Sequence, residues 1–128
     1  MRTMGLISGM MGNAGPIEPA SAQQEFGRLL GNGEQIYAGF LLVRDAMLFT
    51  NRRLIMVDKQ GISGKRTSYH SIPYRSISHF SVETAGHLDL DAELYIWIGS
   101  DPSPIKQKFN RQVDIYEVQG ILSHFIAV

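Results

Sequence analysis

From Gly33 onward the chain consists of short runs rich in β-branched and aromatic residues, each ended by turn-forming residues. Runs of this length and spacing are typical of antiparallel strands in a meander or sandwich. We predict seven strands, at about residues 35–43, 46–50, 53–57, 65–72, 77–83, 93–99 and 105–109. Only Arg44-Asp45 separates the first two runs, a gap that a tight hairpin turn can fill. The sequence therefore predicts a mainly β domain.

We expect one helix before these strands in the sequence and one after them. Residues 23–30 predict a short helix that carries its apolar side chains on one side and ends at Gly31, with Ser21 as its N-cap. Near the C-terminus, apolar residues recur at spacings of three and four: Ile115, Val118, Leu122 and Phe125. This is the stripe of an amphipathic helix that packs on the β domain. Asn110 is its predicted N-cap, with Asp114 in its first turns.

The residues before the first helix are rich in structure-breaking types. Positions 12–22 include Asn, Ser, two Gly and two Pro, a composition that predicts a linker or an irregular lead-in. We therefore expect an N-terminal segment and linker over residues 1–22 and a single domain over residues 23–128. A chain of this mass buries about two-thirds of its surface on folding, so a hydrophobic core is available.

Charge and composition exclude several classes of function. Twelve Lys and Arg residues balance twelve Asp and Glu residues, and binding to nucleic acid depends on an excess of positive charge. Nucleic acid is therefore not an expected partner, and contact with an anionic membrane is disfavoured but stays open. The absence of Cys excludes disulfides and thiol chemistry and leaves only His and carboxylate ligands for a metal. No apolar run reaches the roughly 20 residues of a membrane-spanning helix.

Several ordered motifs carry a specific resemblance. They are LVRD at 42–45, FTNRRL at 49–54, VDKQG at 57–61, SIPY at 71–74, FSVETAG at 80–86 and DLDAEL at 89–94. Together they make the chain, from about Gly5 to Val128, similar to the bacterial pleckstrin-homology-like domains, a family of single-domain proteins of uncharacterised function. The resemblance implies a pleckstrin-homology-like barrel or sandwich of about seven antiparallel strands, capped by the C-terminal α-helix. With the N-terminal helical segment, the expected class is mainly β, or α+β.

The resemblance also implies a function. It implies a cytoplasmic, non-catalytic protein whose copies associate into a closed ring, with a pentamer as one expected form. A polar surface would form where the strands of neighbouring copies meet, and an unidentified protein is the expected partner. We accordingly expect a binding or scaffold module and no cofactor. Peripheral binding of phospholipid headgroups is the alternative, and a metal-dependent enzyme is a weaker one.

The run from Glu93 to Gly99 is apolar on both faces. Leu94, Ile96 and Ile98 alternate with Tyr95 and Trp97. A strand with two apolar faces must be covered on both sides, by its own domain, a helix or a partner. We therefore expect a contact between copies of the chain that involves three of these residues: Tyr95, Ile96 and Trp97.

Polar residues at the predicted strand ends are the candidates for the binding surface. They are Arg44, Asp45, Asn51, Arg53, Lys65, Glu83, Asp89, Asp91 and Glu93. The acidic residues among them are of the type that holds Ca²⁺ or Mg²⁺, but their spacing matches no EF-hand, and we expect ion pairing or ligand recognition instead of a metal. The hairpin at Arg44-Asp45 is too short to cradle a phosphoinositide headgroup as longer pleckstrin-homology loops do.

Other patterns give no support for an enzyme. The four His residues show no metal-ligand spacing, and no Ser lies in a nucleophile elbow. The stretch from Gly61 to Lys65 suggests a phosphate loop, but Lys59 and Arg66 stand where a Walker motif needs Gly and Ser or Thr. We therefore predict no catalytic residues and no metal site.

Overall fold

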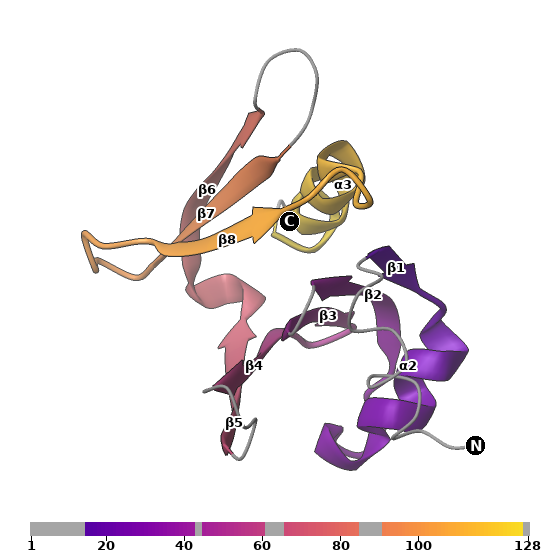
Figure 1. The fold of residues 1–128 in the computed structure, drawn as a ribbon. Coiled ribbons are helices and arrows are strands. Elements are labelled where there is room, and N and C mark those ends of the chain that lie inside the picture. Colours follow the sequence, from indigo (N-terminus) through magenta and orange to yellow (C-terminus); the bar gives the residue numbers. More distant parts are fainter. Residues whose placement is uncertain (1–14, 43–44, 61–65, 85–90, 127–128) are drawn as a thin grey trace. The chain divides into compact units, whose positions relative to one another are not determined.

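The computed structural model describes residues 15–42, 45–60, 66–84 and 91–126 (Figure 1). The chain divides into two compact units, Met1–Ile72 and Pro73–Val128, and each is described by itself. Over the described residues the chain is mostly antiparallel β-sheet, with eight strands, a short helix before β2 (Ile36–Leu42) and a C-terminal helix. The predicted mainly β class is therefore confirmed.

The first unit is built on a five-stranded sheet in the order β1-β2-β3-β4-β5. Its strands are β1 (Gly15–Ile17), β2 (Ile36–Leu42), β3 (Asp45–Thr50), β4 (Arg53–Gln60) and β5 (Arg66–Pro73). The helix α2 (Pro19–Phe26) and the 3₁₀-helix η1 (Gly27–Leu29) lie between β1 and β2 in the chain. The second to fifth strands match the first four predicted runs, with β4 extending three residues further than expected.

The first hairpin differs from the prediction by one residue. Leu42 of β2 pairs with Asp45 of β3, so Asp45 belongs to the strand and not to the turn. Residues 43 and 44 connect the two strands and lie outside the described residues. The short hairpin is confirmed, but the expected Arg44-Asp45 turn is wrong in its second member.

The expected linker over residues 12–22 is wrong for the part that the structure describes. Residues 15–17 form the edge strand β1, in which Ile17 pairs with Gly39 of β2. A Cβ on Gly39 would lie 2.8 Å from Ile17 Cγ2, so the glycine allows this close approach. The helix then begins at Pro19 with Glu18 at the N-cap position, not with the predicted Ser21, since proline suits the first helical turn.

The helix α2 covers one part of the hydrophobic core of this unit. Its buried residues Ala22 and Phe26 join a cluster with residues of β1 to β4. Leu29 and Leu30 pack against the same cluster, as the predicted apolar side of the helix requires. Burial of this face fixes the position of the loop that leads from η1 into β2.

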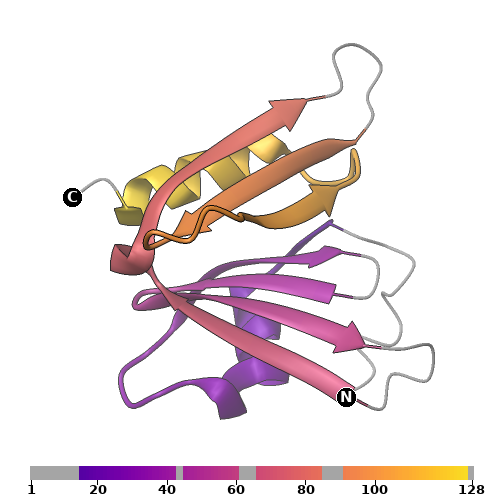
Figure 2. The ribbon, with the colours of Figure 1, turned by 90° about the vertical axis from the view of Figure 1, so that its left-hand side faces the viewer.

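The second unit contains a three-stranded antiparallel sheet and one helix. The sheet order is β6 (Ile77–Thr84), β7 (Ala92–Ile98) and β8 (Ile105–Phe109). The 3₁₀-helix η2 (Tyr74–Ser76) precedes the sheet, and α3 (Ile115–Ile126) follows it. The helix packs against β6 and η2 (Figure 2), and its Phe125 ring stacks on Tyr74 with 4.6 Å between ring centroids.

The C-terminal helix has the predicted stripe but a different cap. Ile115, Val118 and Leu122 are buried, as the amphipathic pattern indicates. The carboxylate of Asp114 accepts a hydrogen bond from the backbone N–H of Tyr116 at 3.0 Å, so Asp114 is the N-cap. Asn110, the predicted cap, instead accepts from the N–H of Gln112 and stabilises the preceding turn. Within the described part of the chain, no helix is long and apolar enough to cross a membrane.

Candidate interaction surface

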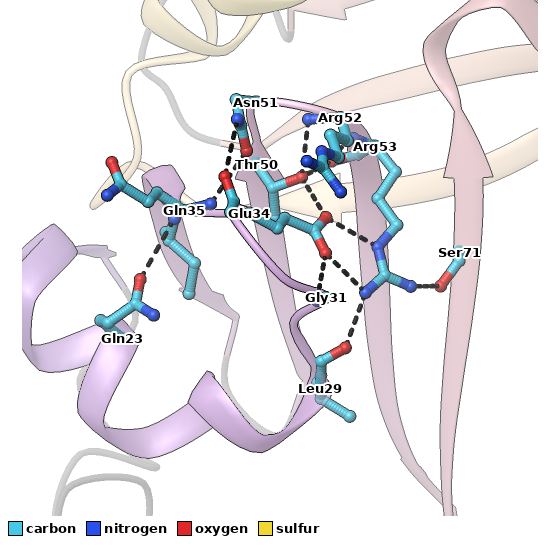
Figure 3. Close-up of polar contacts among 12 residues, drawn as sticks. Gln23, Leu29, Gly31, Glu34, Gln35, Thr50, Asn51, Arg52, Arg53 and Ser71 are labelled. Atoms are coloured by element: carbon cyan, nitrogen blue, oxygen red, sulfur yellow. Dashed lines mark hydrogen bonds and ion pairs between the residues drawn. The ribbon is translucent and has the colours of Figure 1, made fainter.

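In the first unit, polar side chains gather around Arg53 at the start of β4 (Figure 3). Its Nε donates to Glu34 Oε2 at 2.8 Å and one terminal nitrogen donates to Glu34 Oε1 at 3.0 Å. The same guanidinium donates to the Leu29 carbonyl at 2.7 Å and to Ser71 Oγ at 2.7 Å. Arg53 therefore connects η1, the loop before β2, and β5. We call Arg53, Glu34 and Thr50 the Arg53 cluster.

Thr50 and Gly31 complete the hydrogen bonding of Glu34. The Thr50 hydroxyl donates to Glu34 Oε2 at 2.6 Å, and the Gly31 N–H donates to Oε1 at 2.9 Å. The hydrogen bond from Arg53 is the largest cause that lowers the pKa of Glu34, to about 2, although burial acts in the opposite direction. The same interaction raises the pKa of Arg53. Glu34 is therefore a buried carboxylate held in its ionised form.

Asn51 holds the same loop from the neighbouring turn. Its side-chain oxygen accepts from the Gln35 N–H at 2.9 Å, and its amide nitrogen donates to the Gly33 carbonyl at 3.3 Å. The structure thus brings Asn51 and Arg53 together, as two of the predicted binding residues. Their polar groups bond within the chain, so their position shows a structural role in fixing the loop.

Asp45 lies at the opposite end of β3 from this cluster. Its carboxylate accepts a hydrogen bond from the backbone N–H of Lys59 at 3.2 Å, which ties β3 to β4. Three further predicted residues, Arg44, Lys65 and Asp89, lie outside the described residues. Among the described residues of the first unit, Asn51 and Arg53 are the two of the predicted set that lie in one place.

In the second unit, strand pairing places one set of side chains on a single face of the sheet. Glu93 pairs with Glu83 and Lys108, Tyr95 with Ser81 and Lys106, and Trp97 with His79. Because directly paired residues point to the same side of a sheet, these eight side chains share one face, which we call the outer face. Leu94 and Ile96 point to the other side and are buried at 0% and 1% exposure.

The aromatic side chains of the outer face are held in fixed contacts. The His79 ring stacks on Trp97 with 4.3 Å between centroids and an angle of 13°. The ring centroids of Tyr95 and Trp97 lie 6.2 Å apart, and both side chains are half-buried. The Tyr95 hydroxyl donates to Glu93 Oε1 at 2.7 Å. The face thus has an aromatic row along β7 that its own neighbours orient.

Charged groups surround this row. Lys106 Nζ lies 3.6 Å from Glu93 Oε2 and 5.7 Å from the centroid of the Tyr95 ring. The hydrogen bond between Tyr95 and Glu93 lowers the pKa of Glu93 and raises the pKa of Tyr95 to about 12. Glu83 stands directly opposite Glu93, which places two carboxylates side by side on neighbouring strands.

The structure therefore separates the predicted binding residues into groups. Glu83 and Glu93 lie together on the outer face, while the exposed Asp91 precedes β7. Of the three residues expected at a contact between copies, Tyr95 and Trp97 lie on the outer face and Ile96 lies buried on the other. Sequence reasoning missed His79 and Lys106 on this face, although strand alternation places both there. It also missed Glu34, for which no local pattern exists.

The described residues show no arrangement for metal chemistry. Among them, no group of three or more His, Asp and Glu side chains is close enough to hold a metal ion. What the outer face offers instead is ring surface, two carboxylates and two ammonium groups on one side of the sheet, which is the chemistry of molecular recognition.

Comparison with known proteins identifies the family. The model of the bacterial PH domain matches residues 5–126. The uncharacterized protein YjqA of Bacillus subtilis is 50% identical over 121 residues, which cover 94% of this chain and 97% of the relative. A DUF1696 family protein with a pleckstrin-homology domain from Shewanella loihica is 41% identical with a TM-score of 0.79, over 89% of this chain and 97% of that one. A pleckstrin homology domain from Shewanella amazonensis is 40% identical with a TM-score of 0.78, over 95% and 98% of the two chains. The predicted resemblance is confirmed, and the chain belongs to the bacterial PH-domain family.

Proposed function

We propose that the chain is a non-catalytic binding module that forms a closed ring of identical copies and presents a polar surface to a protein partner. The outer face of the β6-β7-β8 sheet is the observation that carries the binding role. It combines half-buried aromatic rings, a residue type enriched at protein interfaces, with charged groups of the kind that form the polar rim around such rings. Rigid aromatic side chains supply contact area at a low entropic cost.

The division between the two faces of β7 bears on how copies would meet. Ile96 is buried within the chain and has no surface to offer a neighbour. Tyr95 and Trp97 share their face with Glu83 and Glu93, and we assign them to the displayed surface. The contact between copies then falls on other surfaces, such as the outer edges of β6 and β8, each of which has a strand neighbour on one side only among the described residues. Unpaired strand edges are ready templates for association.

A ring would make a weak surface effective. Identical sites held at fixed distances bind a multivalent partner far more tightly than one site does, because each later contact is intramolecular. A surface of only three strands is small for a stable complex of one copy, so repetition supports the proposed mechanism.

The solution mass tests this proposal. Light scattering across a dilution and salt series should give one discrete oligomer whose mass does not change with concentration. A mass of 14.3 kDa at all concentrations would refute the ring and return the search to a site on one copy. A mass that changes continuously with concentration would also contradict a closed assembly.

A further inference from the structure

The outer face places two carboxylates directly opposite each other, although it carries two Lys side chains as well. Glu83 pairs directly with Glu93 across β6 and β7, and like charges in this arrangement destabilise a sheet. Glu93 is bonded to Tyr95 and Lys106, and Lys108, its pair on β8, also helps to lower its pKa. Glu83 is exposed, and no hydrogen bond or ion pair to it is found within the described residues. A cation placed at Glu83 would relieve the repulsion.

The same face already holds a cation of the chain itself. The Lys106 ammonium lies near both the Glu93 carboxylate and the Tyr95 ring, a combination of ion pairing and cation–π attraction. The Glu93 side chain is 26% exposed beside it and Glu83 is exposed, so a partner can reach both carboxylates. This contact shows which chemistry the face favours, namely a positive charge between an aromatic ring and a carboxylate.

Spacing along β7 adds a second requirement. Glu93 and Trp97 are four positions apart on one strand, which corresponds to about 13 Å. Trp97 stacks with His79 on one side of its ring and remains half-buried, so it offers a partner an apolar surface and not a charge. A ligand that uses both ends of the face must span this distance in an extended form.

From these observations we infer that the outer face binds an extended, basic peptide segment of a partner protein, with an Arg or Lys at Glu83 and an apolar side chain about four residues away at Trp97. This inference rests on the proposed binding function and names the chemistry of its partner. Arginine suits the acidic end best, because its planar guanidinium can bond to a carboxylate and stack on a ring.

The test uses the intact chain and two synthetic peptides. The first is acetyl-Gly-Arg-Gly-Ser-Gly-Leu-Gly amide, and the second replaces its Arg by the neutral analogue citrulline. Trp97 is the only tryptophan of the chain, so its emission reports binding at the face. We expect saturable binding of the arginine peptide and a loss of about three- to fivefold in affinity for the citrulline peptide, as for one exposed ion pair.

A matched pair of variants locates the binding. Glu83→Gln should lower the affinity for the arginine peptide by roughly the same three- to fivefold. The affinity for the citrulline peptide should not change. Glu117→Gln removes an exposed carboxylate from α3 and should change the affinity for neither peptide. An unaltered emission with the arginine peptide, or equal affinity in the wild type and Glu83→Gln, would overturn the inference.

The mass of the same samples separates this inference from the proposed ring. A discrete oligomer that fails to bind the arginine peptide would overturn the basic-peptide inference and leave the ring in place. A monomer that binds the peptide through Glu83 would refute the ring and support the outer face as the binding surface.

Discussion

At the scale of single residues, the buried carboxylate of Glu34 organises the first unit. It accepts hydrogen bonds from Arg53, Thr50 and Gly31, and its side chain is 3% exposed. A charge in such a place is stable only while its partners remain, because removal of one partner leaves desolvated charge behind. The stability of the surrounding loop therefore depends on Arg53 more strongly than it would on one member of an exposed ion pair.

Replacement of Arg53 should lower the stability of the protein strongly, and replacement of the neighbouring Arg52 should not. We expect Arg53→Met to lower the free energy of unfolding by about 3 kcal/mol, because Glu34 loses its charged partner in a buried position. Arg52→Met, at an exposed residue of the same turn, should change it by less than about 0.5 kcal/mol. Urea unfolding at neutral pH measures both variants, and equal effects would contradict the role of the Arg53 cluster.

The same carboxylate predicts how stability depends on pH. The pKa of Glu34 is lowered from 4.5 to about 2 in the folded chain, so the folded state binds its proton less readily than the unfolded state. Its contribution is complete above about pH 4.5 and is lost as the pH falls toward 2, with a total of about 3 kcal/mol. In Glu34→Gln this part of the acid destabilisation should be absent. An identical pH dependence in both proteins would contradict the assignment.

At the scale of elements, close packing of β1 on β2 depends on Gly39. A Cβ there would lie 2.8 Å from Ile17 Cγ2 and 3.2 Å from Leu48 Cδ2. A Cβ on Gly120 in α3 would meet no atom within 4 Å. The first glycine is required by its neighbours. The second only lowers the stability of its helix, because glycine is a poor helix former.

Alanine at these two positions should therefore have opposite effects. Gly39→Ala should destabilise the protein by about 1–3 kcal/mol, since the new methyl group displaces a packed strand. Gly120→Ala should stabilise it by about 0.5–1 kcal/mol. Thermal unfolding of the two variants compares them directly, and a neutral Gly39→Ala would show that β1 is not packed as described.

The elements also show what a sequence can reveal. Strand alternation placed Tyr95 and Trp97 on one face and Leu94 and Ile96 on the other, because a period of two is a local property of the chain. The strand β1 was missed because its pairing with β2 joins residues far apart in sequence. Arg53 was predicted as a binding residue, but its bond to Glu34 was missed for the same reason, since the two are 19 positions apart. Asn110 and Asp114 are both residue types that cap helices, and only the backbone path of the intervening turn decides between them.

At the scale of the whole molecule, membership of the bacterial PH-domain family fixes the fold but leaves function to the sites on it. The two units have different roles in the proposed binding module. In the first unit the side chains of the Arg53 cluster bond to each other, while the second unit presents an aromatic and charged face. We therefore expect this face to bind a partner and other surfaces to hold the ring together.

The central claim is therefore a ring that leaves the outer face available. The most direct measurement is the solution mass of the wild type beside that of Trp97→Leu, with circular dichroism to verify that the variant is folded. We expect the same discrete multiple of 14.3 kDa for both proteins at every concentration. A monomeric wild type would contradict the ring, and a folded but monomeric Trp97→Leu would place Trp97 at the contact between copies instead of on the binding surface.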